Sequence, residues 1–216
     1  MRGAMKGAMR QISLPFDRPG HAGAQDVGDE FLVSDANRIA VRHLENWQSW
    51  PLAISVLSGP PLSGRSTLGR HFVAMSGGTV IDDAQAQDDR TLFNAWNEAQ
   101  TARRPLLMIG DAPPQQWQVA LPDLRSRLAA VPHVALEQPD EALAHALIER
   151  SLASAGASYA ADLPDWLLRR IERSYAAIAA VTRLLDEAAL SSGRKISVAM
   201  AKEALHAAGF LPILPD

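Results

Sequence analysis

The feature that most constrains this chain is a glycine-rich loop that follows a short apolar run and opens a helical pattern. The apolar run covers residues 53–57, the loop covers 58–64, and the helical spacing begins at Arg65. A strand, a glycine loop and a helix in this order bring backbone N–H groups and the positive end of a helix to one point, where they bind phosphate. The segment therefore predicts a phosphate-binding loop.

Further apolar runs alternate with helical patterns along the chain. The runs at 79–81, 106–109 and 133–136 have the length of strands. A first helix is expected to begin at Ser34 as N-cap and to stop before Pro51, with Ile39, Val41, Leu44 and Trp47 at helical spacing. Further helices are expected at 89–102 and 123–130. Because strands that alternate with helices form parallel sheets, the sequence predicts an α/β fold.

The glycine loop matches the phosphate-loop pattern G-x-x-x-x-G-K-[ST], except that Arg65 stands where the pattern has lysine. In such a loop the basic side chain reaches the β- and γ-phosphates, and the hydroxyl binds magnesium. A planar guanidinium holds phosphate but need not support the same transfer geometry. We therefore expect this site to bind a nucleotide more readily than to hydrolyse it. An ordinary Gly/Pro turn is the alternative. The residues expected to bind ADP or ATP are Gly59, Pro60, Pro61, Ser63, Gly64, Arg65, Ser66 and Thr67.

The apolar run at 79–81 ends in two carboxylates, Asp82 and Asp83. Two aspartates after a strand more often make a turn when taken alone. Their position after the phosphate loop favours a Walker-B site, which holds magnesium and orients water. We therefore expect Mg²⁺ to be held by Ser66, Asp82 and Asp83.

The last third of the chain is almost wholly helical in pattern. We divide the chain into a disordered leader at 1–30, an α/β nucleotide-binding domain at 31–138 and a small all-helical domain at 139–216. Breaks at glycine, serine and arginine positions separate four expected helices, which cover 140–155, 162–172, 175–191 and 197–208.

The composition excludes several classes of protein. The chain has 216 residues and no cysteine, so disulfides, thiolate zinc sites and a catalytic thiol are excluded. Lys and Arg number 21 against 24 Asp and Glu, which leaves no excess of positive charge for non-specific DNA binding. No apolar stretch reaches the roughly 18 residues that span a bilayer, and the basic start lacks the apolar region of a secretory signal. We expect a cytoplasmic protein without membrane contact.

Four segments besides the loop carry a family resemblance: 11–16 (QISLPF), 31–40 (FLVSDANRIA), 109–114 (IGDAPP) and 121–128 (LPDLRSRL). Together they resemble the Hda family, bacterial regulators of replication initiation that are similar to the AAA+ part of the initiator DnaA. The resemblance implies an AAA+ P-loop core followed by a helical lid. It also implies that 31–40 lies near the nucleotide base and that 109–114 ends the sensor-1 strand.

The hexapeptide at 11–16 looks like the family's motif for the sliding clamp, the β subunit of DNA polymerase III. In that resemblance Gln11 supplies a hydrogen bond, and the anchors that fill an apolar groove are Leu14, Pro15 and Phe16. The alternative is a strand or latch that packs on its own domain. The resemblance further implies that DNA is reached only indirectly, and it is compatible with a homo-oligomer.

In the 121–128 segment, Arg127 corresponds to the family's arginine finger. Such a guanidinium acts on ATP held by another subunit, here a DnaA protomer, and stabilises the charge that develops during hydrolysis. The alternative is a surface salt bridge between Arg127 and Asp123. Arg125 lies two residues away on the same expected helix, so it cannot share a face with Arg127.

The sequence also departs from the family. Ala176 occupies the place of the sensor-2 arginine, and Arg183 is only a weak substitute. Only 16 residues separate Arg65 from Asp82, too few for the strand and helix that the family inserts there, which leaves open a sheet that is one strand short. The lost sensor-2 arginine, together with Arg65 in place of the loop lysine, argues against self-hydrolysis of ATP.

We therefore expect a clamp-tethered AAA+ regulator that promotes hydrolysis of ATP bound to DnaA. Two other classes remain as alternatives. One is a self-sufficient P-loop ATPase, such as a loader or remodeller, which would show a steady-state ATPase rate. The other is a replisome adaptor with a vestigial nucleotide site, which would bind neither ADP nor ATP.

Overall fold

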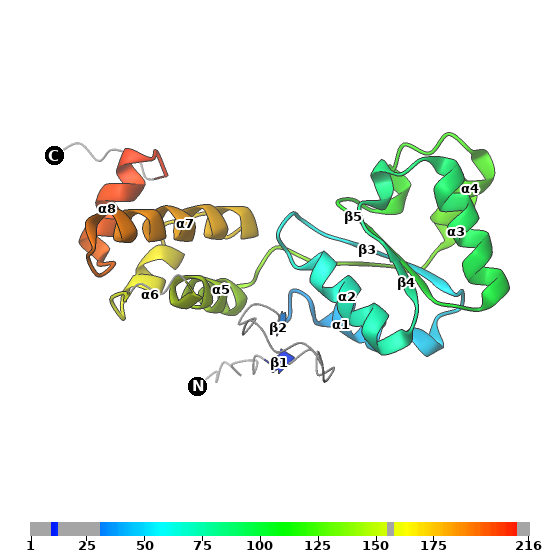
Figure 1. The fold of residues 1–216 in the computed structure, drawn as a ribbon, viewed down its shortest axis with the longest axis horizontal. Coiled ribbons are helices and arrows are strands. Elements are labelled where there is room, and N and C mark those ends of the chain that lie inside the picture. Colours follow the sequence, from blue (N-terminus) through cyan, green and yellow to red (C-terminus); the bar gives the residue numbers. More distant parts are fainter. Residues whose placement is uncertain (1–9, 13–30, 155–157, 211–216) are drawn as a thin grey trace, which may run out of the picture. The chain divides into compact units, whose positions relative to one another are not determined.

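The computed structural model describes residues 10–12, 31–154 and 158–210. The chain divides into two compact units, Met1–Glu137 and Gln138–Asp216. The first unit contains the sheet and the second is built of helices (Figure 1). None of the helices in the described ranges has the length and apolar character needed to cross a bilayer.

The main sheet of the first unit has four parallel strands in the order β4-β5-β3-β6. Every residue of β3 and β5, the two inner strands, is buried, as expected for a parallel sheet that is covered on both faces. The apolar runs predicted as strands are confirmed. The strands are Ile54–Ser58 (β3), Thr79–Ile81 (β4), Leu106–Gly110 (β5) and His133–Ala135 (β6).

Helices cover the two faces of this sheet. The α-helices are Arg38–Glu45 (α1), Arg65–Ser76 (α2), Asp89–Ala102 (α3) and Pro122–Ala130 (α4), with 3-10 turns at Trp47–Ser49, Ala84–Ala86 and Pro114–Gln116. Successive strand residues point to opposite faces. Val56 and Met108 pack with side chains of α3 and α4, whereas Leu57 and Ile109 pack with those of α1 and α2. The unit is therefore a three-layer α/β/α domain.

The chain between α2 and β4 is short. The helix ends at Ser76 and the strand begins at Thr79, so neither strand nor helix is inserted in this fully described segment. β4 is accordingly the last strand on its side of the four-stranded sheet. This agrees with the short spacing from Arg65 to Asp82.

A second, two-stranded sheet pairs β1 (Arg10–Ile12) with β2 (Phe31–Val33) in antiparallel register. Gln11 lies opposite Leu32. Strand β1 lies within the segment 1–30, which was predicted as a disordered leader, and the alternative for the hexapeptide was a strand or latch that packs on its own domain. The remaining predicted anchors lie outside the described residues: Leu14, Pro15 and Phe16.

The first helix begins later than the sequence suggests, because hydrogen bonds between neighbouring residues fix a turn before it. Ser34, expected as the N-cap, uses its hydroxyl to accept a hydrogen bond from the N–H of Ala36 at 3.2 Å. Asn37 is the N-cap instead, and its Nδ2 donates to the carbonyl of Leu32 in β2 at 2.8 Å. Ile39, expected on the buried face, is 76% exposed.

The second unit is an all-helical domain with its own apolar core. Ile178, Val181 and Leu185 line the buried face of its longest helix. Ser174 and Ser197 cap two helices through their side-chain oxygens. The four predicted helices are confirmed, although α6 ends four residues early: Glu141–Ser154 (α5), Leu163–Leu168 (α6), Tyr175–Ser192 (α7) and Val198–Ala207 (α8).

Candidate functional site

The predicted phosphate loop connects β3 to the N-terminus of α2. Gly64 caps α2 with a φ of +89°, which favours glycine, and a Cβ there would lie 2.7 Å from the ring of Phe31. At the start of the loop, a Cβ on Gly59 would lie 2.8 Å from Cβ of Leu136. Packing therefore requires glycine at both ends. The free N–H groups and the dipole at the start of α2 favour an anion there.

Two side chains inside the loop have unusual environments. Leu62 has a φ of +65° and is 67% exposed. This left-handed conformation is strained for leucine, and strained residues are frequent at functional sites. Ser63 Oγ is buried and has no hydrogen-bond partner among the described residues. A buried hydroxyl without a partner is unfavourable by about 1–3 kcal/mol. The strained Leu62 and the unpaired Ser63 hydroxyl are therefore both unfavourable features of this loop.

Arg65, the first residue of α2, forms an ion pair with Asp111, which directly follows β5. Only 16% of the Arg65 side chain is exposed, against 56% for Asp111. The N–H of Asp111 donates to Oε1 of Gln85 at 2.7 Å, and Nε2 of Gln85 donates to Oδ1 of Asp83 at 3.0 Å. The guanidinium that was predicted to hold phosphate is thus paired with a carboxylate of the same chain.

The two carboxylates predicted to hold magnesium follow β4. The N–H of Asp83 donates to Oδ1 of Asp82 at 3.0 Å, and Asp83 has a φ of +51°, which aspartate tolerates better than most residues. Both aspartates and Ser66 are exposed. Magnesium prefers hard oxygen ligands and usually takes one or two carboxylates together with phosphates, so these three side chains fit it chemically. Nowhere in the described ranges do three or more His, Asp or Glu side chains form a metal-binding group by themselves.

Sheet topology brings these groups to one edge. β3, β4 and β5 are parallel neighbours, so their carboxyl ends lie at the same edge of the sheet. The phosphate loop follows β3, Asp82 and Asp83 follow β4, and Asp111 follows β5. In open α/β sheets, ligands bind outside the carboxyl ends of the strands. The arrangement can therefore hold a phosphorylated ligand and a divalent cation.

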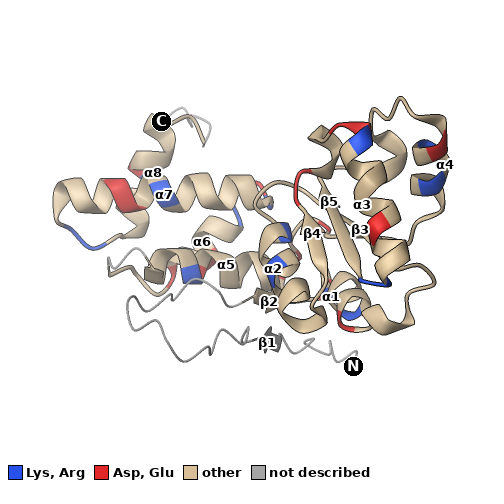
Figure 2. Ribbon diagram, turned by 45° about the vertical axis from the view of Figure 1, so that its right-hand side comes forward, with Lys and Arg blue, Asp and Glu red and all other residues tan. Residues whose placement is uncertain are grey.

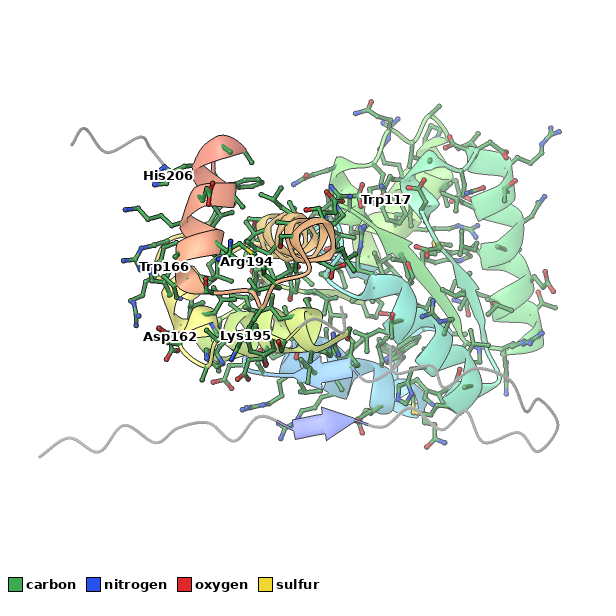
Figure 3. All side chains as sticks on the ribbon, turned by 60° about the vertical axis from the view of Figure 1, so that its left-hand side comes forward. Trp117, Asp162, Trp166, Arg194, Lys195 and His206 are labelled. Carbon is green, nitrogen blue, oxygen red and sulfur yellow. The ribbon has the colours of Figure 1, made fainter. Side chains whose placement is uncertain are left out.

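Gly110, the last residue of β5, allows the close approach of Gln85. A Cβ on Gly110 would lie 2.4 Å from Oε1 of Gln85 and 2.9 Å from Cζ2 of Trp117. Trp117 is buried, and its indole N–H donates to the carbonyl of Ala112 at 2.8 Å (Figure 3). These contacts fix the chain around Asp111.

The sequence did not single out Gln85 or Asp111 as site residues. Asp111 lies inside the segment 109–114, so the family resemblance was the signal that could have found it. Gln85 follows the carboxylates of β4 by two residues but accepts its hydrogen bond from a residue 26 positions away. No local pattern encodes that contact.

Arg127, the predicted finger, lies on α4 and has three partners on α3 and α4. It pairs with Asp123 Oδ2 at 2.8 Å, donates to Asn97 Oδ1 at 3.0 Å, and stacks over the ring of Phe93 at 4.8 Å. The pair with Asp123 is the salt bridge that the alternative interpretation expected. Figure 2 shows acidic and basic residues close together on α4. The Arg127 side chain nevertheless remains 32% exposed.

Arg125 has a different environment on the same helix. Its Nε and Nη2 both donate to the carbonyl of Val119, at 3.0 and 2.6 Å. The N–H groups of Ala120 and Leu121 in turn donate to the carboxylate of Asp89 at 2.7 Å each. Arg125 and Asp89 therefore fix the loop before α4, which makes Arg125 a structural residue and sets the position of α4 against α3.

The helical unit does not supply an obvious phosphate ligand at the positions that the family resemblance marks. Ala176 is exposed in the first turn of α7. Arg183 is 78% exposed, and its Nε lies 4.0 Å from Oε1 of Glu187 one turn later. Arg183 is thus an exposed residue on the surface of α7.

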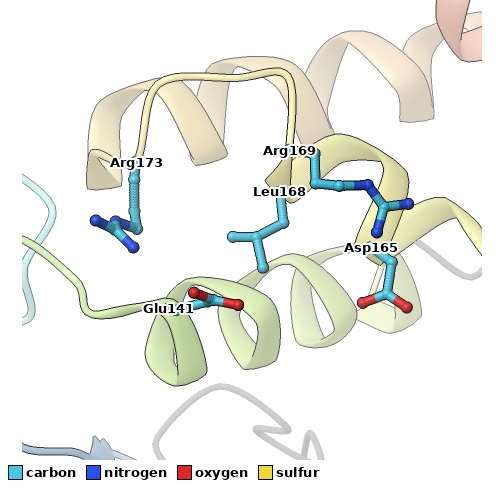
Figure 4. Close-up of a pocket in the computed structure, with 5 residues that line it drawn as sticks. All are labelled: Glu141, Asp165, Leu168, Arg169 and Arg173. Carbon is cyan, nitrogen blue, oxygen red and sulfur yellow. The ribbon is translucent and has the colours of Figure 1, made fainter.

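A separate cavity of about 320 Å³ lies within the helical unit (Figure 4). Arg169 lies beside Asp165 at one end of it, and Arg173 lies at the other. Because acidic and basic side chains both line the cavity, it has no excess of positive charge for an anion. Its lining residues are Glu141, Asp165, Leu168, Arg169 and Arg173.

No protein-family profile matches this sequence. Among solved structures, the chain is similar to domain III of the replication initiation protein DnaA from Thermotoga maritima, with a TM-score of 0.68 and 16% identity over 84% of this chain and 95% of that one. It is also similar to AMPPCP-bound DnaA from Aquifex aeolicus (TM-score 0.56, 18% identity), where the match covers 72% of this chain and 63% of that protein.

A variant of Thermotoga maritima RuvB is similar as well, with a TM-score of 0.60 and 13% identity over 80% of this chain and 68% of that one. These likenesses concern the fold. The chain has the AAA+ fold of DnaA and RuvB, and the predicted fold class is confirmed.

Proposed function

We propose that this chain is an Hda-like regulator of replication initiation, which binds the sliding clamp and promotes hydrolysis of ATP held by DnaA. The AAA+ fold, which it shares with DnaA domain III, supports a role beside that initiator. The observation that carries the proposal is the position of Arg127. Its guanidinium lies on the surface of α4, outside the chain's own phosphate loop, and remains partly exposed.

In this role Arg127 acts in trans. Its guanidinium faces the γ-phosphate of ATP in a DnaA protomer and stabilises the charge that develops as the bond to that phosphate breaks. Such fingers contribute about 10³–10⁵ in rate. The pair between Arg127 and Asp123 joins residues one turn apart on a partly exposed helix, and pairs of this kind are worth about 0.3–0.5 kcal/mol. A phosphate can replace so weak a partner.

The leader supplies the tether to the clamp. Gln11 provides the hydrogen bond and the apolar anchors are Leu14, Pro15 and Phe16. Since Gln11 is part of β1, whose partner is β2, we expect β1 to leave β2 when the peptide enters the clamp's groove. Only three residue pairs join the two strands, so their separation breaks few hydrogen bonds.

The chain's own loop binds ADP or ATP with Mg²⁺ in this proposal. The loop 59–67 holds the phosphates, and Ser66, Asp82 and Asp83 hold the cation. Because Ala176 replaces the sensor-2 arginine, one contact to a γ-phosphate is lost, while loop amides remain for the β-phosphate. We expect ADP to bind at least as well as ATP. The protein acts in the cytoplasm, with DNA reached through the clamp.

A second candidate is an adaptor with a vestigial nucleotide site. The ion pair between Arg65 and Asp111 favours it, because the guanidinium already has an anionic partner. Isothermal titration with ADP and ATP separates the two functions. The adaptor binds neither nucleotide, whereas the regulator binds ADP.

The proposed function is tested by measuring hydrolysis of DnaA-bound ATP on DNA that carries loaded clamp, with and without this protein. We expect hydrolysis to accelerate. The matched control is the double variant Leu14→Ala, Phe16→Ala, which should lose clamp affinity by roughly 2–4 kcal/mol for each anchor and lose the stimulation with it. A wild-type protein that leaves hydrolysis unchanged contradicts the proposal, and a steady-state ATPase rate of the pure protein points to a self-sufficient enzyme.

A further inference from the structure

The ion pair between Arg65 and Asp111 occupies the place where a phosphate would meet the loop's basic side chain. Arg65, at the start of α2, has a side chain that is only 16% exposed. In such a partly buried position the attraction between opposite charges is stronger than in water. A phosphate that binds Arg65 must therefore displace a carboxylate and not merely water.

We propose that Asp111 is a specificity-determining residue of the phosphate loop: it competes with phosphate for Arg65, and it opposes an anionic ligand that arrives without a divalent cation. The inference rests on the nucleotide site of the proposed function. It adds that a carboxylate of the same chain competes with the nucleotide's phosphate for Arg65.

The backbone keeps Asp111 near the site after its side chain is displaced. Its N–H donates to Gln85, and a Cβ on Gly110 would clash with Gln85 and Trp117, so the chain at this point is closely packed. The displaced carboxylate therefore remains at the edge of the sheet that also carries Asp82 and Asp83. Three carboxylates at one edge repel a phosphate, which Arg65 and the N-terminus of α2 attract.

A divalent cation offsets this repulsion, because it carries two positive charges and accepts carboxylate and phosphate oxygens together. The affinity for a nucleotide should consequently depend strongly on Mg²⁺. A neutral side chain at position 111 should reduce that dependence. If Asp111 merely positioned Arg65, the neutral side chain would weaken nucleotide binding or leave it unchanged.

The test is isothermal titration of the full chain with ADP, once in EDTA and once in Mg²⁺. The variants are Asp111→Asn, which removes the charge, and Asp111→Glu, which keeps it. Asp165→Asn is the matched control, because Asp165 is similarly exposed and lies in the helical unit, where its carboxylate is 3.1 Å from Nε2 of His145. Thermal unfolding of each variant establishes that it folds.

We expect Asp111→Asn to bind ADP about tenfold more tightly than the wild type in EDTA, and the ratio of the two dissociation constants, EDTA over Mg²⁺, to fall by a similar factor. Asp111→Glu and Asp165→Asn should show no gain. Unchanged or weaker binding by a folded Asp111→Asn overturns the inference but leaves the proposed nucleotide site standing. If neither the wild type nor Asp111→Asn binds ADP in Mg²⁺, both the inference and that site are overturned, while stimulation of DnaA remains a separate result.

Discussion

The two regions expected to meet phosphate each contain an arginine that pairs with an aspartate of the same chain, but the pairs are built differently. Arg65 and Asp111 join the start of α2 to the end of β5, and Arg65 is only 16% exposed. Arg127 and Asp123 lie one turn apart on α4, and Arg127 is 32% exposed. The first pair is a tertiary contact and the second is a contact within a surface helix.

This difference decides what each arginine can do. The partner of Arg65 is fixed by a further hydrogen bond to Gln85, so exchange of that partner requires a competing charge. Arg127 pairs with an exposed aspartate on the same helix, and water and salt screen such pairs; its other contacts are a hydrogen bond to Asn97 and the ring of Phe93. In the proposed function Arg127 exchanges these contacts for a phosphate of another molecule, whereas Arg65 meets the phosphate of the chain's own loop.

The largest loss of unfolding free energy should come from adding a side chain at Gly64, where the phosphate loop meets Phe31. Gly64→Ala puts a side chain in a left-handed conformation and 2.7 Å from the ring of Phe31. We expect a loss of about 2–4 kcal/mol of unfolding free energy, since strain and overpacking add. Urea unfolding measures this loss.

Gly77→Ala is the matched control, because Gly77 has a similar φ of +65° but no atom within 4 Å of the added Cβ. It should lose only about 1–2 kcal/mol, from the backbone strain alone. Equal losses in the two variants would show that the ring of Phe31 does not restrict the loop at Gly64. The close packing described at the start of α2, next to Arg65, would then be wrong.

A smaller effect distinguishes the two arginines of α4. Arg125→Ala leaves the carbonyl of Val119 without its two donors and should lower the unfolding free energy by about 1–2 kcal/mol. Arg127→Ala should lower it by about 1 kcal/mol or less, because its polar partners Asp123 and Asn97 are exposed. Thermal unfolding of both variants decides the matter, and a greater loss for Arg127→Ala would mean that Arg127 is a structural residue.

The smallest effect is the dependence of stability on pH. It arises from histidines of the sheet domain and involves neither Arg65 nor Arg127. Burial lowers the pKa of His43, His71 and His133 from the usual 6.5, and for His43 the nearby His133 lowers it further. The folded state thus binds protons less readily than the unfolded chain. The stability that these neutral rings provide is present above the unfolded pKa of 6.5 and is lost as the pH falls through the folded pKa values.

We expect the melting temperature to decrease between about pH 7.5 and 5.5. His43→Gln should reduce the decrease, because a glutamine side chain does not titrate and can still reach the hydroxyl of Ser55, which lies 2.6 Å from Nε2 of His43. A melting temperature that rises on acidification would contradict this account of the buried histidines.

The same contrast between local and tertiary contacts explains what the sequence could predict. The helix at Asp89–Ala102 was predicted with its observed bounds, because its apolar spacing and its N-cap, Asp88, are local signals. The pair of Arg127 with Asp123 was foreseen as an alternative for the same reason, since residues four apart on a helix are neighbours.

Contacts between distant segments were not predictable in this way. The pairing of Arg65 with Asp111 depends on the order of β3 and β5 in the sheet, which no local pattern gives. The start of α1 was misplaced for a different reason: a local hydrogen bond from Asn37 to Leu32, five residues earlier, holds a turn that the helical spacing did not reveal, and Ile39 remains 76% exposed.

The most direct test of the account is single-turnover hydrolysis of DnaA-bound ATP on clamp-loaded DNA with wild-type protein, Arg127→Ala and Arg127→Lys. Arg127→Ala should still bind the clamp but no longer accelerate hydrolysis. Lysine should not rescue it, because an ammonium lacks the planar fork that holds phosphate oxygens in pairs. Acceleration by Arg127→Ala equal to that of the wild type would contradict the central claim that Arg127 acts in trans.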